Sequence, residues 1–182
     1  MIRRPLLLSL PLLAAAAPAL AQAPARPTLG DVGQALMRDL QRAGEAAASE
    51  ALAQWIWSSR ADAVKAGVSP IPAAIRSRLK GHFPEALLAR VRYRVGTGNE
   101  YSLQTHAFKG NAAAITLGDV ILFRPAEKSA DDPRLWAHEL THVQQYDRWG
   151  VRGFAQRYTL DHVSIEREAE AGAARYSASR GK

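Results

Sequence analysis

The chain has 182 residues, with 24 lysines and arginines against 17 aspartates and glutamates, which gives a formal net charge of +7. It contains no cysteine, so disulfide stapling and lipoprotein anchoring are excluded, and the fold must rest on an apolar core or on a metal. The arginines are scattered among apolar positions and form no basic tract, so we expect no nucleic-acid partner.

The amino terminus has the pattern of an export signal. Arg3 and Arg4 precede an apolar run over residues 6–17, and an Ala-Leu-Ala cleavage motif follows at residues 19–21. We therefore predict a signal peptide over residues 1–21 and a periplasmic or secreted protein. The run is short and broken by prolines, so we expect no integral membrane span after cleavage; an uncleaved anchor is the alternative. The mature chain would have 182 minus 21, or 161, residues and a net charge of 22 minus 17, or +5.

Residues 22–68 form the predicted N-terminal helical segment. A lead-in rich in proline and glycine is followed by a helix from Asp31 to about Ala66. Its apolar residues recur every three or four positions, at Val32, Leu36, Leu40, Ala43, Ala47, Ala51 and Trp55. This seam must be buried, and we expect it to pack on the rest of the domain; a regulatory or pro-segment role is the alternative.

Short elements follow the N-terminal segment. Residues 72–80 and 84–89 predict short helices, and the alternation over residues 90–95 predicts a half-buried strand. Residues 112–117 and 120–123 are apolar runs joined by Gly118 and Asp119, a connection that suits a β-hairpin. The second run lies just before the motif described next. As an edge strand it could pair with an extended substrate.

The motif that carries the chemistry is His138-Glu139-Leu140-Thr141-His142, the pattern H-E-x-x-H. On a helix, histidines four residues apart lie on one face, so both imidazoles can bind one zinc ion while the glutamate reaches a water molecule on the metal. Asp132 fits the N-cap of such a helix, Pro133 its first turn, and Gly150 its end. The alternative is a surface helix that carries two histidines and binds no metal.

The predicted metal helix is apolar on two sides. Its apolar residues form two groups, Trp136, Leu140 and Val143 on one side and Leu135, Tyr146 and Trp149 on the other, beside both histidines. A helix of this kind is buried between layers. A buried imidazole needs a polar partner, which a metal would supply; a hydrogen-bonded core histidine is the alternative.

A catalytic zinc site needs a third protein ligand and an open position for water. The final helix, predicted from about Ser164 to about Ser177, carries three carboxylates, of which Glu166 lies nearest its inward face by helical phase. Glu168 and Glu170 remain alternatives for the ligand, and Glu170 could instead orient a zinc-bound histidine. His162 is a further alternative ligand. The remaining histidines, His82 and His106, have no companion at ligand spacing.

With a metal in place, the predicted reaction is hydrolysis of a peptide bond. Glu139 would take a proton from the activated water and deliver it to the leaving amine. Tyr146, Tyr158 and His162 are candidate donors to the developing oxyanion, although each also suits a structural role.

The stretch from Leu135 to Gln145, LWAHELTHVQQ, resembles the signature of the eCIS core domain family. Domains of this family are found beside contractile injection systems and are regarded as metallopeptidases without a settled substrate. The resemblance extends from about Ser69, through the hairpin at Gly118 and Asp119, to Gln145.

A second resemblance concerns the final helix. Glu166-x-x-Ala169-Glu170 is similar to the E-x-x-A-D pattern of the gluzincins, with glutamate in place of aspartate at position 170. It implies His138, His142 and Glu166 as zinc ligands and Glu139 as general base. The resemblances imply a mainly helical α+β fold, with a zincin-like metallopeptidase core over residues 69–182 whose helices lie on one side of a short antiparallel sheet.

The leading hypothesis is an exported zinc-dependent hydrolase that acts on a peptide or protein. In a second hypothesis, the protein binds zinc without catalysing hydrolysis. It would then serve as a binding scaffold or interaction domain in the cell envelope or in a secreted assembly. A third is an envelope-bound structural protein whose N-terminal helix docks on a partner. An envelope or delivery partner is compatible with all three.

Overall fold

The structure is a computed structural model that describes residues 29–96, 113–125 and 129–180, with side chains between residues 41 and 179 of those ranges. The predicted signal peptide, the lead-in to residue 28 and the segment 97–112, with His106, lie outside the described residues. The elements follow in the order α1 (Leu29–Lys65), β1 (Ser69–Pro70), α2 (Ala73–Leu79), α3 (Glu85–Arg90), β2 (Arg92–Val95), β3 (Ala114–Leu117), β4 (Val120–Phe123), a 3-10 helix η2 (Ser129–Asp131) and α5 (Pro133–Arg180).

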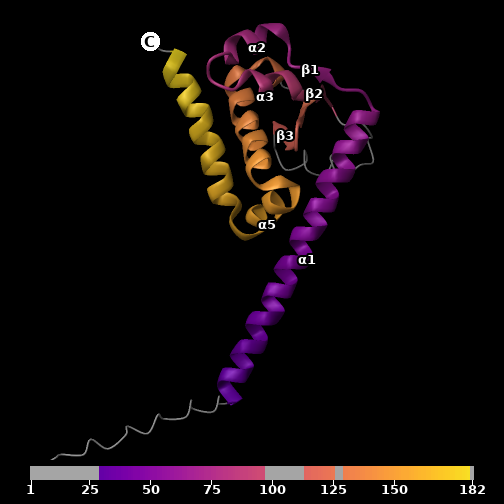
Figure 1. Ribbon diagram of the computed structural model, residues 1–182, viewed down its shortest axis with the longest axis vertical. Coiled ribbons are helices and arrows are strands. Elements are labelled where there is room, and N and C mark those ends of the chain that lie inside the picture. Colours follow the sequence, from indigo (N-terminus) through magenta and orange to yellow (C-terminus); the bar gives the residue numbers. More distant parts are fainter. Residues whose placement is uncertain (1–28, 97–112, 126–128, 181–182) are drawn as a thin grey trace, which may run out of the picture.

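The N-terminal segment forms one long helix, α1, as its periodicity predicts. In Figure 1 its carboxyl half runs beside the other elements and its amino half extends beyond them. Ala53, Ile56 and Ala63 are buried where α1 packs on the rest of the protein. Arg60 Nε lies 2.6 Å from Asp119 Oδ1 and ties α1 to the turn between β3 and β4. Among the described helices, none has both the length and the apolar character that crossing a membrane requires.

The strands form a mixed sheet in the order β1-β2-β4-β3. The predicted hairpin is confirmed, since β3 pairs antiparallel with β4 and places Leu117 opposite Val120. The expectation of an antiparallel sheet is wrong for one pair, because β4 runs parallel to β2 with Arg92 opposite Val120. A parallel pair needs a long crossover, and the chain from residue 96 to residue 119 provides it.

Strand β4 lies inside the sheet and is not the edge strand that its place in the sequence suggested. All four residues of β4 are buried. Ile121 and Phe123 belong to an apolar cluster that α2, α3 and α5 complete, whereas Val120 and Leu122 belong to a second cluster that α1 and α5 complete. Since side chains alternate across a strand, helices cover both faces of β4, and the expectation of helices on one side only is wrong. Of the two hairpin strands, β3 is the one that lies at an edge of the sheet.

The two short helices predicted before β2 are confirmed as α2 and α3. Ile75 and Leu79 are buried along one side of α2, as their spacing predicts, and Ile71 is buried just before the helix. Leu87 and Leu88 of α3 join them in the first apolar cluster. This cluster supports one side of the first part of α5.

Two non-helical residues divide α5 into three helical segments, residues 133–149, 151–160 and 162–180. Gly150 ends the first segment, as predicted, with a φ of 66° that glycine adopts without steric cost. Asp161 lies before the third segment and caps it, because its Oδ1 accepts a hydrogen bond from the Ser164 backbone N–H at 3.1 Å. The chain thereby folds back, and the third segment lies beside the first (Figure 1).

Candidate metal centre

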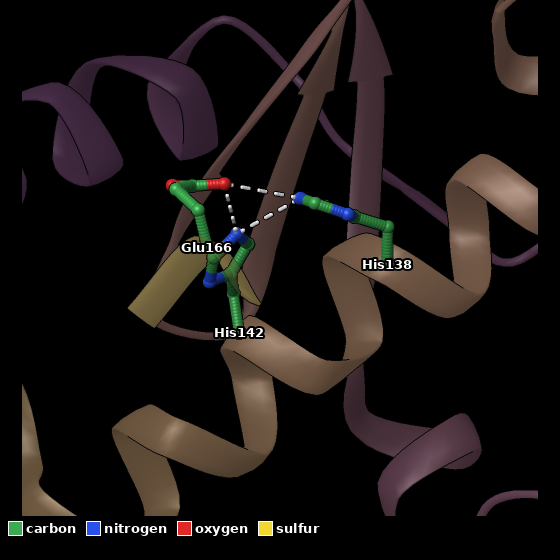
Figure 2. Close-up of side chains that lie close together, drawn as sticks. All are labelled: His138, His142 and Glu166. Atoms are coloured by element: carbon green, nitrogen blue, oxygen red, sulfur yellow. Dashed lines mark hydrogen bonds and ion pairs between the residues drawn. The ribbon is translucent and has the colours of Figure 1, made fainter. Parts of the chain in front are cut away.

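His138 and His142 lie one turn apart on the same face of the first segment of α5 (Figure 2). This segment begins as predicted, since Asp132 Oδ1 accepts a hydrogen bond from the Arg134 backbone N–H at 2.8 Å. The side chains of His138 and His142 are 19% and 8% exposed, so both imidazoles are largely buried but remain accessible to a ligand.

Glu166 reaches the two imidazoles from the third segment of α5 (Figure 2). Its Oε2 lies 3.3 Å from Nε2 of His138 and 3.6 Å from Nε2 of His142, and the two nitrogens are 3.2 Å apart. The helical phase of Glu166 predicts this placement.

Gly172 allows the two segments to approach closely enough for this contact. A Cβ atom at position 172 would lie 2.1 Å from Oγ1 and 3.1 Å from Cβ of Thr141 on the first segment. Any larger residue would therefore push the third segment outward. The close helix contact that positions Glu166 depends on the absence of a side chain at position 172.

The spacing of the three ligand atoms fits a tetrahedral metal ion. Zinc–nitrogen bonds of about 2.0–2.1 Å at the tetrahedral angle place neighbouring ligand atoms about 3.3–3.4 Å apart. The observed separations of 3.2, 3.3 and 3.6 Å surround this value. Two imidazoles and a carboxylate can thus hold a divalent metal ion and leave a fourth position open.

Gln145 fixes the tautomer of His142. Its amide Nε2 donates to the backbone oxygen of Ile165 at 3.1 Å and to Glu168 Oε2 at 3.0 Å, so its Oε1 must face His142. This oxygen lies 2.8 Å from His142 Nδ1 and accepts its proton, which leaves the lone pair of Nε2 for a metal. This role is not predicted from the sequence, although Gln145 lies three residues after His142 on the same helix.

The other carboxylates of the third segment lie around the centre and not in it. Glu168 accepts hydrogen bonds from Gln145 and from Arg148, the latter at 2.6 Å. Glu170 pairs with Arg134, and its Oε2 lies 3.7 Å from His138 Nδ1, close to the position that an orienting carboxylate would take. Of the three candidate carboxylates, the structure therefore brings Glu166 to the two histidines.

Glu139 lies beside the centre and is 4% exposed. Its Oε2 accepts a hydrogen bond from Thr116 Oγ1 of β3 at 2.6 Å. The glutamate and the three candidate ligands line a cleft of about 600 Å³ that is bounded by β3, α1 and all three segments of α5. A buried carboxylate held by a hydroxyl group next to an open metal position has the placement of a general base.

The charges of the centre favour a cation. The close approach of the His138 and His142 imidazoles holds the pKa of Glu166 well below its ordinary range, against the opposite effect of burial. Burial alone would lower the pKa of His142, but Glu166 and Glu139 outweigh it and raise that pKa. The two carboxylates thus create a negative potential that a bound metal would neutralise.

The tyrosines predicted as oxyanion donors line the cleft and already have partners. Tyr158 donates its hydroxyl proton to Glu166 Oε1 at 3.1 Å, and Tyr146 donates to the backbone oxygen of Thr116 at 3.2 Å. Burial and the charge of Glu166 raise the pKa of Tyr158 to about 12, so its hydroxyl stays protonated. His162 is exposed and does not line the cleft, and His82 pairs with Ser179.

Comparison with protein families identifies the segment that carries the two histidines. Residues 70–150 match the eCIS core domain. The match supports the family that the stretch from Leu135 to Gln145 resembles. Comparisons with curated proteins and with solved structures found no match. Residues 70–150, which we call the eCIS core segment, include His138, His142 and Glu139. Glu166 and the wall of the cleft formed by α1 lie outside this segment.

Proposed function

We propose that this protein is an exported zinc-dependent metallopeptidase of the gluzincin type. The observation that supports it most strongly is the convergence of His138, His142 and Glu166 at tetrahedral spacing, beside the buried Glu139. Zinc at these ligands would supply an activated water molecule and polarise the scissile carbonyl.

Side chains of the cleft carry out the proton transfers and orient the metal ligands. Glu139 takes the proton of the attacking water and delivers it to the leaving amine. Thr116 holds the carboxylate of Glu139 through Oε2 and leaves Oε1 for the proton transfer. Gln145 and Tyr158 keep His142 and Glu166 oriented toward the metal.

The edge strand β3 is the proposed binding site for the substrate backbone. Residues 113–116 line the cleft beside the metal centre, and within the described residues β3 pairs only with β4. An extended peptide can add to such an edge through main-chain hydrogen bonds. The peptide would then lie across the open metal position.

Export is part of the proposal because of the pattern at residues 1–21. The protein would then meet its peptide or protein substrates in the periplasm or outside the cell. The match to the eCIS core domain fits a role in a larger secreted assembly. That match also favours a second candidate function, a zinc-binding scaffold that keeps the metal centre without turnover.

A Glu139→Gln variant separates the two functions. Glutamine keeps the size and the hydrogen bond from Thr116 but cannot act as a base, so the variant should retain zinc and lose hydrolysis by roughly a hundredfold or more. Peptide-library cleavage and zinc content are measured together, with Glu85→Gln on α3 as an exposed control. Unchanged hydrolysis in Glu139→Gln would contradict the proposed mechanism. A zinc-loaded wild type that cleaves no peptide would support the scaffold.

A further inference from the structure

The cleft has a second wall that is apolar. Leu52, Trp55 and Ile56 of α1 contribute to it, together with Phe154 of the second segment of α5. Ile56 is 1% exposed and Phe154 is 6% exposed, whereas Leu52 and Trp55 are half-buried. Leu52 and Trp55 therefore present apolar surface to whatever occupies the cleft.

An aromatic stack supports this wall. The rings of Tyr146 and Phe154 are stacked with centroids 4.0 Å apart, and Phe154 stacks in turn on Tyr158 at 5.6 Å. His142 lies next to the stack, with its ring centroid 6.1 Å from that of Phe154 and the two rings nearly perpendicular. The wall is thus a fixed surface that continues up to the metal centre.

The two tyrosine hydroxyl groups at the wall are already occupied. The hydroxyl groups of Tyr146 and Tyr158 donate to Thr116 and Glu166. A ligand at the wall therefore meets mainly hydrocarbon and aromatic carbon. An apolar side chain gains free energy by leaving water there, whereas a charged side chain would lose its hydration without gaining a partner.

We infer that this wall is the subsite for a bulky apolar side chain next to the scissile bond, and that Trp55 determines the preference for it. The inference rests on the proposed function, since it takes the occupant of the cleft to be a peptide beside the metal centre. It assigns a binding role to α1, which lies outside the eCIS core segment.

Trp57 provides a matched control on the same helix. Its ring is 38% exposed, does not line the cleft and lies 5.2 Å from the guanidinium carbon of Arg152. A substitution at Trp57 changes the same residue type two positions away without touching the subsite.

The first test needs neither metal nor turnover. The sequence has four tryptophans, so the indole N–H signals of the ¹⁵N-labelled protein can be assigned with Trp55→Phe and Trp57→Phe variants. In zinc-free protein, N-acetylphenylalaninamide should shift the Trp55 signal, N-acetylglycinamide at equal concentration should not, and the Trp57 signal should stay in place. An unmoved Trp55 signal, or equal shifts at both tryptophans, would overturn the subsite.

The second test uses the zinc-loaded protein and peptides that differ at one position. Trp55→Ala should raise the KM for phenylalanine peptides about tenfold relative to glycine peptides, with kcat and zinc content kept, and Trp57→Ala should change neither. An unchanged preference in Trp55→Ala would overturn the assignment. If no peptide is cleaved at all, the proposed hydrolysis fails, while the indole shifts still decide whether the apolar subsite exists.

Discussion

Gln145 is the residue that orients His142 and connects it to the helix that carries Glu166. It is 0% exposed, and its three hydrogen bonds join His142 on the first segment of α5 to Ile165 and Glu168 on the third. The same side chain therefore fixes the orientation of an imidazole and the position of the helix that carries Glu166.

Gln145→Ala is expected to weaken zinc binding by about 10–100-fold, because His142 would lose the partner that holds its tautomer. Competition with a chromophoric chelator measures this affinity. Gln144→Ala, at the half-buried neighbouring position, is the control and should bind zinc as the wild type does. Equal affinities for the two variants would show that Gln145 has no such role.

At the residue scale, the sequence indicates which candidate ligands come together better than it indicates the residues that support them. The spacing of His138 and His142 and the helical phase of Glu166 depend on the geometry of a single helix, which the sequence determines. The contacts of Gln145 and Thr116 with the centre require the relative placement of separate elements. The periodicity of apolar residues within one segment does not predict how separate elements are placed relative to one another.

At the scale of elements, the packing of two helices at Gly172 controls whether Glu166 reaches the histidines. Gly172→Ala should destabilise the protein by about 1–3 kcal/mol, because the new methyl group overlaps Thr141, and should weaken zinc binding with it. Urea unfolding and zinc titration measure the two effects.

Gly44→Ala is the control for this substitution. Position 44 is an exposed position of α1, and an added Cβ there would have no atom within 4 Å. Alanine at position 44 should therefore keep zinc binding and raise stability by up to about 1 kcal/mol. A Gly172→Ala variant as stable as the wild type would contradict the packing account.

The ion pair between Arg60 and Asp119 joins α1 to the β3–β4 turn. Burial raises the pKa of Asp119, but the hydrogen bond and charge of Arg60 outweigh it, so the pKa lies below its ordinary value. A carboxyl group with a lowered pKa in the folded state stabilises that state above its unfolded pKa of about 3.9. The stabilisation is lost as the pH falls through the folded pKa.

Asp119→Asn should therefore lower the free energy of unfolding by roughly 0.5–1 kcal/mol at about pH 7, since the pair is partly exposed, and by less at about pH 3.5. Chemical unfolding at both pH values measures the difference. Asp62→Asn, at an exposed position of α1, should show no comparable pH-dependent loss. A loss for Asp119→Asn that does not change with pH would rule out the ion pair as its cause.

The elements themselves were largely predictable, and the sheet order was not. The break at Gly150, the caps at Asp132 and the hairpin at residues 118–119 follow from local backbone chemistry. The interior place of β4 follows from the pairing of distant strands. Its unbroken apolar sequence, Val120 to Phe123, is typical of a strand with both faces buried, and that signal argued against an edge position.

At the scale of the whole molecule, the candidate metal centre and its cleft combine the eCIS core segment with helices on both sides of it. This segment supplies the two histidines and Glu139, the third segment of α5 supplies Glu166, and α1 closes the cleft. Neither the segment nor the flanking helices contain the complete site. The arrangement explains why a family match over residues 70–150 does not by itself identify the third ligand.

The zinc content of the purified protein tests this account most directly. Elemental analysis should find one zinc ion per chain in the wild type and in Glu168→Gln, whose amide oxygen can still accept the hydrogen bond from Gln145. His142→Ala and Glu166→Gln should lose most of the metal, because each removes one of the three ligands. A zinc-free wild type, or a His142→Ala variant with undiminished zinc, would contradict the central claim.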